Sequence, residues 1–383
     1  MYRKLTADKI FNGHQFLPAN SVLILDQNNT IIDVIKRAEA GEDVKFHEGI
    51  LSPGFINCHC HVELSHMKGM IPKETGLIEF LLGVMGKREA EKEIIEQAIE
   101  IAEHEMIANG IVAVGDICNT NLSIPQKRKG KLYYHNFIEV SGFPLEVADK
   151  RFEQSNFLFK EFSALHSNNS IVPHAPYSVS QVLMQKIIDF EKNAIISMHN
   201  QEAQDENDFY RSKQGGFLEL YNKLNINIDF FDPQYKSSLL TLLPHFNNAQ
   251  KLLLVHNLHT NESDIVSTKE KYKEQLDNLF FCLCPNANKY ISGDLPDVNL
   301  FVQQQCNLVI GTDSLASNEH LSIMGEINTI LESNATISME DALKWATLNG
   351  AKFLGIDEQY GSFEIGKKPG INLINERRVE KLF

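Results

Sequence analysis

The sequence predicts an α/β protein, a TIM-like (β/α)8 barrel with a small β-sandwich domain built from both chain termini. Three observations support this fold class. From residue 50 onward, short apolar runs alternate with longer segments of helical periodicity, which is typical of βα units around a parallel sheet. Eight such runs occur, and six of them end in His or Asp. The two ends of the chain instead carry short alternating strands separated by turns.

The small domain is expected to combine residues 1–50 with residues 356–383, each part supplying strands to one β-sandwich. In both segments, β-branched and apolar residues alternate with polar ones between Gly- and Asn-containing turns. The predicted strands are 4–7, 21–25, 30–35, 361–367 and 370–375.

The barrel is expected to occupy residues 51–355. Its eight predicted strands are 50–61, 111–116, 132–140, 170–174, 194–199, 252–256, 279–284 and 308–313. Helical segments between them include 89–109, 179–190, 237–246 and 323–331. Active sites of such barrels lie at the carboxyl ends of the strands, so polar residues that end these runs are the first functional candidates.

Composition narrows the class of protein. The chain has 383 residues, of which 43% are hydrophobic and 22% charged, as expected for a globular protein with a core. A net charge of −14 argues against a nucleic-acid partner, which needs clustered Lys and Arg. No segment resembles a signal peptide or approaches the ~18 apolar residues of a membrane span. We therefore expect a cytoplasmic protein that acts on a small molecule, does not contact membranes, and could form a homodimer.

Two histidines one residue apart, His59 and His61, end the first predicted barrel strand. Alternate residues of a strand share a face, so both imidazoles point the same way. A His-x-His pair alone is weak evidence, but His199 ends the fifth strand and Asp313 ends the eighth. Three imidazoles and one carboxylate suit a single Zn²⁺ or Fe²⁺ ion with room for a water molecule, whose pKa the metal would lower towards ~7.

Three further residues are candidates around this predicted metal site. Glu202 follows His199 by three residues and could shuttle protons between water and a substrate nitrogen, although a solvated loop acid is the alternative. His256 ends the sixth strand, either as a fourth imidazole ligand or as a donor that orients the water. His174 ends the fourth strand, where a two-metal site would need a carboxylated Lys. One catalytic metal is therefore favoured, with His174 free to contact substrate.

These residues resemble the amidohydrolase superfamily, in particular its mononuclear-metal aminohydrolase branch, which includes cytosine, guanine, S-adenosylhomocysteine and aminodeoxyfutalosine deaminases. The resemblance covers nearly the whole chain. It includes the Pro-Gly-Phe-Ile-Asn of 53–57 before the paired histidines, the Pro-His-Ala-Pro-Tyr-Ser of 173–178, and the His-x-x-Glu of 199–202. It continues with Val-His-Asn-Leu-His at 255–259, Gly-Thr-Asp-Ser at 311–314, and the Gly-Ser-Phe-Glu-Ile-Gly-Lys of 361–367.

The resemblance implies hydrolytic deamination of an amino-purine or amino-pyrimidine compound. It implies one divalent metal ion, Zn²⁺ or Fe²⁺, held by the paired histidines, His199 and Asp313. His256 would hydrogen-bond the attacking water, Asp313 would take its proton, and Glu202 would deliver that proton to the ring nitrogen beside the attacked carbon. A tetrahedral intermediate would then release ammonia.

The segment after the first barrel strand departs from the nucleoside-type deaminases, because Glu63 and His66 replace apolar residues there. Both are candidate substrate contacts, with a loop ion pair as the alternative for Glu63. Aminodeoxyfutalosine is the specific substrate that the resemblance suggests. Its benzoate would need a cation, and Lys68, Lys73 and Arg211 are candidates by location. The same site could serve a cyclic amidase, or a hydrolase that displaces chloride or an alkylamine from a triazine; a non-catalytic metal-binding barrel is the weaker alternative.

Overall fold

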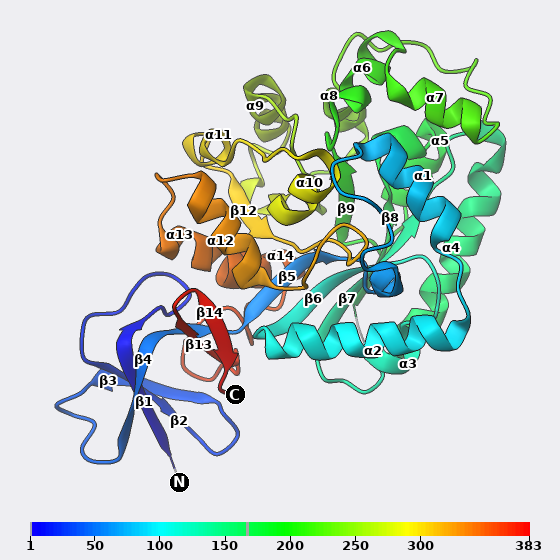
Figure 1. The fold of residues 1–383 in the computed structure, drawn as a ribbon. Coiled ribbons are helices and arrows are strands. Elements are labelled where there is room, and N and C mark those ends of the chain that lie inside the picture. The colour runs from blue at the N-terminus through cyan, green and yellow to red at the C-terminus, as the bar shows by residue number, and fades with distance from the viewer. Residues whose placement is uncertain (1, 166–167) are drawn as a thin grey trace.

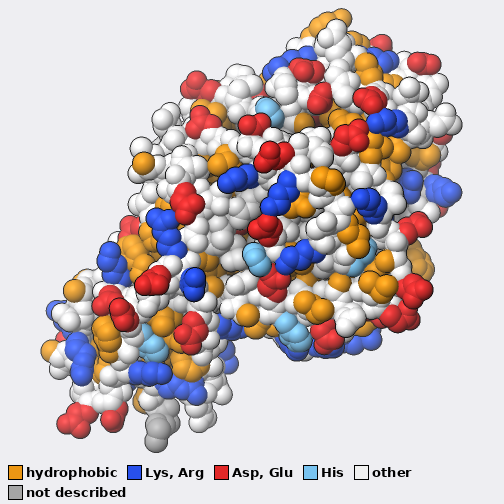
Figure 2. Space-filling model, viewed as in Figure 1, with side chains coloured by type: hydrophobic (Ala, Val, Ile, Leu, Met, Phe, Trp, Pro, Cys, Tyr) orange, Lys and Arg blue, Asp and Glu red, His pale blue; other side chains and the backbone are white. Residues whose placement is uncertain are grey.

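A computed structural model describes residues 2–165 and 168–383 and shows two parts, a helix-covered barrel and a smaller sheet that carries both chain ends (Figure 1). Acidic and basic side chains are interspersed over the face seen in Figure 2, without one large basic patch on that face. No helix within the described residues is long and apolar enough to cross a membrane.

The barrel is made of parallel strands. In the described part of the chain these form two four-stranded sheets, with the orders β5-β6-β7-β8 and β12-β11-β10-β9. Backbone hydrogen bonds join the sheets at both edges, from the His199 nitrogen to the His174 oxygen (2.9 Å) and from the Thr312 nitrogen to the His59 oxygen (3.0 Å). The strands are β5 (Phe55–Cys60), β6 (Ile111–Cys118), β7 (Tyr133–Val140), β8 (Asn168–Pro173), β9 (Ile195–Asn200), β10 (Lys251–His256), β11 (Leu279–Leu283) and β12 (Asn307–Ile310). A parallel strand therefore lies at each of the eight predicted runs.

Helices follow the strands and cover the barrel (Figure 1). Several begin at a capping residue, as where Ser180 and Ser322 accept hydrogen bonds from backbone N–H groups three residues on. The helices are α1 (Leu77–Lys87), α2 (Lys92–Ala108), α3 (Ile124–Lys127), α4 (Ala148–Phe162), α5 (Gln181–Ile188), α6 (Gln204–Ser212), α7 (Gly216–Lys223), α8 (Ser238–Leu242), α9 (Glu262–Lys271), α10 (Pro285–Ser292), α11 (Val298–Gln303), α12 (Ile323–Ser333), α13 (Met339–Lys344) and α14 (Gly350–Leu354). The predicted segments 89–109, 179–190 and 237–246 each contain one of them, and the predicted segment 323–331 lies within α12.

Short helical turns lie in the connections. The 3₁₀ turns are η1 (Val62–Met67), η2 (Leu145–Val147), η3 (Ser163–Leu165), η4 (Pro176–Ser178), η5 (Leu243–His245) and η6 (Leu276–Asn278), and the π-helical turn is η7 (Trp345–Asn349).

Aromatic side chains close the barrel at the amino end of its strands. Phe353 of α14 packs against Phe137 of β7 and Phe280 of β11, with ring centroids 6.2 and 5.4 Å away. β7 and β11 belong to opposite halves of the barrel, so the Phe353 ring packs against both halves. The buried cluster around them leaves the carboxyl ends of the strands as the open side.

The two chain ends meet in one sheet whose six described strands have the order β14-β13-β4-β1-β2-β3. The strands are β1 (Arg3–Ile10), β2 (Ser21–Leu25), β3 (Ile31–Lys36), β4 (Val44–Pro53), β13 (Ile371–Asn375) and β14 (Arg378–Lys381). A second, facing sheet is not present among the described strands, so the predicted β-sandwich is not confirmed. The predicted domain limit at residue 50 falls inside β4.

The predicted first barrel strand, 50–61, is in fact two strands that belong to different sheets. Residues up to Pro53 pair in the terminal sheet, and the barrel strand begins at Phe55. The chain changes sheets at Gly54, where a Cβ atom would meet the Val112 side chain and lie 2.7 Å from the Pro369 oxygen. The continuous apolar run hid this change because the last three residues of β4 and all of β5 are buried.

The predicted strand 361–367 is wrong, because this segment forms turns. Gly361 and Gly366 have φ angles of 82° and 91°, in the left-handed region that interrupts a strand. The segment still contacts the N-terminal strands through backbone hydrogen bonds. The Ile31 nitrogen donates to the Lys367 oxygen (2.9 Å), and the Gly366 nitrogen donates to the Ile31 oxygen (2.8 Å).

Candidate active site

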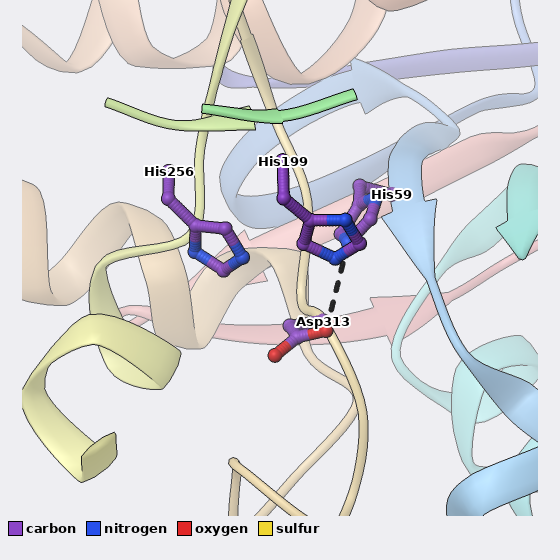
Figure 3. A group of neighbouring side chains, drawn as sticks. All are labelled: His59, His199, His256 and Asp313. Atoms are coloured by element: carbon purple, nitrogen blue, oxygen red, sulfur yellow. Dashed lines mark ion pairs between the residues drawn. The ribbon is translucent and has the colours of Figure 1, made fainter. Parts of the chain in front are cut away.

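Four of the predicted metal ligands converge at the carboxyl end of the barrel (Figure 3 shows three of them with His256). The Nε2 atom of His61 lies 3.1 Å from Nε2 of His59, 3.3 Å from Nε2 of His199 and 3.3 Å from Oδ1 of Asp313. Nε2 of His59 lies 3.5 Å from the same carboxylate oxygen. Ligand atoms around a tetrahedral ion with bonds of 2.0–2.1 Å are separated by roughly 3.3–3.4 Å. The spacing of these donor atoms therefore fits one metal ion.

Two of the proposed metal-ligand side chains form hydrogen bonds through the atom that points away from the donor cluster. The lone pair of their other atom is therefore free to face the metal position. Nδ1 of His199 donates to the His174 oxygen (2.7 Å), so the lone pair of the neutral ring is on Nε2. Oδ2 of Asp313 accepts a hydrogen bond from Ser317 Oγ (2.5 Å), which leaves Oδ1 towards the imidazoles. Hydrogen bonds of this kind fix the orientation of a metal-ligand side chain and, for a histidine, its tautomer.

Burial sets the charges of these side chains. It lowers the pKa of His61 to about 4 and the pKa of His199 well below its ordinary value, so both rings are neutral at pH 7, as metal ligands must be. Burial alone raises the pKa of Asp313, but its hydrogen bond with His59 and the surrounding imidazoles outweigh this effect. The pKa of Asp313 is therefore held well below its usual range, and the carboxylate stays ionised.

His256 has a ligand atom within 4.8 Å of those of His59, His199 and Asp313. Nδ2 of Asn288 lies 3.4 Å from its Nδ1, which places the proton of the neutral ring on Nε2. Nε2 in turn lies 3.5 Å from Oε1 of Glu202. This arrangement favours His256 as a hydrogen-bond donor over His256 as a metal ligand.

Left-handed backbone conformations occur at three strand ends around the site. The φ angles are 72° at His256, 56° at Asp313 and 47° at Gln201, the residue before Glu202. Non-glycine residues adopt this conformation rarely and at some energetic cost, and such residues concentrate at functional sites. Here the turn directs side chains inward just where each strand stops.

Glu202 is buried beside His256 on the segment that follows β9. Oε1 of Glu206 accepts a hydrogen bond from the backbone nitrogen of Gln201 (3.0 Å), which fixes the backbone just before Glu202. Burial raises the pKa of Glu202 well above its ordinary value, and the negative charges of Asp313 and Glu206 add to this effect. The structure thus places the predicted proton-transfer acid beside the metal donors, where burial favours its protonated form.

A cavity of about 480 Å³ opens above the metal donors, a size suited to a small molecule. Its base contains His61, His199 and Glu202. Its walls are apolar side chains of α1, of the β7–α4 connection and of α7 with the residues after it. These are Leu77, Phe80, Leu81, Val84, Met85, Phe143, Pro144, Val147, Leu220, Tyr221, Leu224 and Ile226. Figure 1 shows α1 and α7 on the same side of the barrel.

His174 contributes in two ways. Its ring lines the cavity, where the sequence placed a substrate contact, and Nδ1 lies 3.0 Å from Ser178 Oγ. Its backbone oxygen accepts hydrogen bonds from both the backbone nitrogen and Nδ1 of His199. The end of β8 therefore also orients a metal ligand on β9.

Glu63 and His66, the other predicted substrate contacts, are not among the residues that line the cavity. Oε2 of Glu63 accepts hydrogen bonds from the backbone nitrogens of Asn119 (3.1 Å) and Thr120 (3.0 Å), so its carboxylate fixes the loop after β6. The ring nitrogens of His66 contact the backbone oxygens of Glu63 (3.2 Å) and Arg88 (3.0 Å). Both side chains thus bind neighbouring backbone groups and do not line the cavity.

Three charged residues that line the cavity were missed from the sequence: Glu139, Arg88 and Arg151. Glu139 lies on β7 one residue before its end, and an acid at the carboxyl end of a predicted barrel strand is a usable sequence signal. The arginines come from the end of α1 and the start of α4, outside the strands, and no strand-end pattern marks them. Lys68, Lys73 and Arg211 do not line the cavity, and Nζ of Lys73 pairs with Oε1 of Glu319 at 2.5 Å.

A closed parallel barrel with buried His and Asp donors at its carboxyl end, an adjacent acid and an open cavity defines the class of metal-dependent barrel hydrolases. The model of the amidohydrolase family matches residues 50–382. The chain belongs to this family, which confirms the resemblance seen in its motifs.

Individual relatives narrow the class of enzyme. An adenosine deaminase of Helicobacter pylori (strain ATCC 700392 / 26695) is 27% identical over 339 residues, 86% of this chain and 79% of the relative. A 5'-deoxyadenosine deaminase of Methanococcus vannielii is 26% identical, over 98% of this chain and 86% of the relative. The solved structure of Helicobacter pylori aminofutalosine deaminase with methylthio-coformycin has a TM-score of 0.82 at 23% identity, covering 97% of this chain and 92% of that one. The prediction of an aminohydrolase is confirmed.

Proposed function

We propose that this enzyme hydrolyses the exocyclic amino group of an adenosine-type compound and releases ammonia. The observation that carries the proposal is the position of Glu202, a buried carboxyl group that lines the same cavity as the metal donors and contacts His256. A purine deaminase needs an acid at that place, because the attacked carbon becomes electrophilic only when the neighbouring ring nitrogen takes a proton. The deaminase relatives support the same reaction.

The roles of the side chains follow from their positions. A divalent metal held by His59, His61, His199 and Asp313 would lower the pKa of water towards ~7 and so supply a nucleophile at neutral pH; Zn²⁺ or Fe²⁺ suits these ligands. Asp313 would accept the proton of the attacking water, and Nε2–H of His256 would orient that water. Glu202 would deliver its proton to the ring nitrogen, and the proton that Asp313 took from the water would pass to the amino group, which leaves as ammonia. The hydroxyl proton of the intermediate would return to Glu202 as the carbonyl forms.

The substrate is proposed to carry an apolar and anionic substituent, as aminodeoxyfutalosine does with its benzoate. Arg88 and Arg151 line the cavity, and within residues 2–165 and 168–383 neither guanidinium group has a hydrogen-bond or ion-pair partner. Both also line an adjoining cavity of about 430 Å³, so they stand where the two cavities meet. Apolar walls followed by unpaired guanidinium groups suit an aromatic ring that ends in a carboxylate.

The test of the reaction is ammonia release from adenosine, 5'-deoxyadenosine, aminodeoxyfutalosine, guanine and cytosine, using protein whose metal content has been measured. Strong turnover of an adenosine-type compound with about one metal ion per chain is the expected result. Metal-replete protein that is inert towards every nucleoside but hydrolyses a substituted triazine or a cyclic amide would overturn the proposal.

The test of the substituent is the KM of Arg88→Gln and Arg151→Gln variants. We expect each to raise the KM for aminodeoxyfutalosine about tenfold or more, while the KM for adenosine, which has no carboxylate, changes less than threefold. Arg211→Gln is the matched control, because that arginine does not line the cavity. Equal effects on both substrates, or no effect on either, would remove these arginines from carboxylate recognition.

A further inference from the structure

Glu139 lines the cavity, and its carboxylate has no role in the proposed reaction. Its side chain is 8% exposed, and Oε2 has no hydrogen-bond partner among the described residues. Oε2 lies 3.7 Å from Nδ1 of His199, but that nitrogen donates its proton to the His174 oxygen at 2.7 Å. A buried acceptor without a donor is costly, so an unpaired oxygen on a residue of the cavity wall calls for a donor on the ligand.

The orientation of this carboxylate is fixed from behind. Oε1 of Glu139 accepts a hydrogen bond from Nδ2 of Asn119 (3.0 Å). The backbone nitrogen of Asn119 is held in turn by Oε2 of Glu63 (3.1 Å). A chain of contacts therefore runs from η1 through the end of β6 to β7, and it fixes the carboxylate of Glu139 in the cavity wall.

A second metal ion is a poor occupant of this position. Glu139, His174 and His199 each have a potential ligand atom within 4.8 Å of the others. However, Nδ1 of His199 donates to a carbonyl, and Nδ1 of His174 lies at hydrogen-bond distance from Ser178 Oγ. The nitrogens nearest to Glu139 are thus already used, and a neutral donor from an organic ligand fits better than a cation.

We propose that Glu139 binds the hydroxyl groups of the sugar attached to the deaminated base and makes the enzyme selective for ribonucleosides. Oε2 of Glu139 lies at the Nδ1 side of the His199 ring, whereas Nε2 of that ring faces the other metal donors. In an adenosine-type nucleoside, the sugar hydroxyls are the groups away from the reacting carbon that can donate a hydrogen bond to a carboxylate. This inference rests on the proposed deamination of a nucleoside.

The positions of Arg88 and Arg151 are consistent with a ligand whose sugar and anionic end are bound by different residues. In the described part of the chain neither Arg88 nor Arg151 forms an ion pair with Glu139. All three residues line both cavities, so the acceptor on β7 and the two cations can contact different parts of one molecule, the hydroxyl groups and an anionic end.

The test compares wild-type enzyme with Glu139→Gln on adenosine and on 2',3'-dideoxyadenosine, which lacks the 2'- and 3'-hydroxyl groups that Glu139 is proposed to bind. In the variant, the amide oxygen can keep the contact with Asn119, and the cavity then faces an NH₂ group in place of an acceptor. We expect kcat/KM for adenosine to fall about 100-fold and kcat/KM for the dideoxy compound to change less than threefold. Metal content should remain at the wild-type level. Glu146→Gln is the matched control, since Glu146 is exposed on the same β7–α4 connection and is not a cavity residue.

Equal losses on both compounds, or metal loss, would mean that Glu139 supports His199 and would overturn the proposal. Unchanged activity on both compounds would overturn it as well. If metal-replete wild-type enzyme is inert towards adenosine, the dideoxy compound and every other nucleoside of the panel, the proposed deamination fails and this inference fails with it. The two failures are distinguishable, because only the second abolishes wild-type turnover.

Discussion

Glu202 offers the sharpest test at the scale of single residues, because it is placed for proton transfer and does not belong to the proposed metal ligands. Replacing it with Gln keeps the shape of the side chain and removes the proton that it would deliver. We expect kcat to fall by ~10² or more while the metal content stays unchanged. Steady-state kinetics together with metal analysis of the purified variant check both expectations.

The contrasting variant is His199→Ala, which should lose metal and activity together because one of the converging donors is removed. Activity retained by metal-replete Glu202→Gln protein would exclude that residue from the proton path. Full metal occupancy in His199→Ala would show that the ligand set is wrong.

Strand periodicity was sufficient to predict most of the proposed metal site. His59 and His61 share a strand face by spacing alone, and His199 and Asp313 stand at the ends of runs that had to be parallel strands. The structure brings these side chains together. The position of Glu202 also followed from its distance to His199 along the chain.

The walls of the cavity could not be predicted in the same way. Arg88 and Arg151 reach it from helices, and their positions depend on how α1 and α4 pack on the barrel. Glu63 stood in a suggestive place after the first strand, but local sequence does not show whether a carboxylate points into a cavity or binds loop N–H groups. Here Glu63 fixes Asn119, and Glu139 faces the cavity instead.

At the scale of elements, Gly54 controls the passage from the terminal sheet into the barrel. A methyl group at this position would overlap Val112 and approach the Pro369 oxygen at 2.7 Å. We expect Gly54→Ala to lower the free energy of unfolding by about 2 kcal/mol, as overpacking of a buried site does. Urea unfolding at constant m-value measures the change.

Gly86→Ala is the control for that substitution. Gly86 lies in α1, and a methyl group there would have open space around it. Alanine is the better helix former, so this variant should be as stable as wild type or more stable by up to ~1 kcal/mol. If both variants have the same urea midpoint, the close approach at Gly54 does not constrain the fold.

The two errors among the predicted strands have the same origin. In 50–61, apolar residues continue across a change of sheet, so periodicity gave one strand where there are two. In 361–367, polar and apolar residues alternate as in a strand, but left-handed glycines at both ends make the segment a set of turns. Alternation reports which faces are buried; backbone conformation at glycine is decided by tertiary contacts.

At the scale of the whole molecule, several acids are buried away from the metal donors. Burial raises the pKa of Glu63 to about 7, of Glu206 to about 7 and of Glu326 to about 8. Each accepts hydrogen bonds that fix a loop near the site. Glu326 is one example. Its carboxylate accepts hydrogen bonds from the backbone nitrogen of Asn286 (2.9 Å) and from Nδ2 of Asn318 (2.8 Å), and Asn318 lies in the loop after Asp313. The protonation of these buried acids thus links the stability of the fold to pH.

The sign of this linkage follows from the proton affinities. The folded protein keeps the Glu326 proton up to about pH 8, whereas the unfolded chain releases it near 4.5. The stabilisation from this group is therefore complete below pH 4.5 and is lost as the pH rises to 8. At about 1.4 kcal/mol per pKa unit, the upper limit of the loss is roughly 5 kcal/mol.

Glu326→Gln isolates this contribution, because glutamine does not titrate. We expect the free energy of unfolding of the wild type to fall relative to that of the variant between pH 4.5 and 8, and the difference to level off above 8. Urea unfolding at a series of pH values gives both curves. Glu332→Gln removes an exposed carboxylate of the same helix, 67% exposed, and should follow the wild-type profile. Parallel curves for wild type and Glu326→Gln would show that Glu326 is ionised in the folded protein throughout this range, and that its hydrogen bonds from Asn286 and Asn318 outweigh its burial.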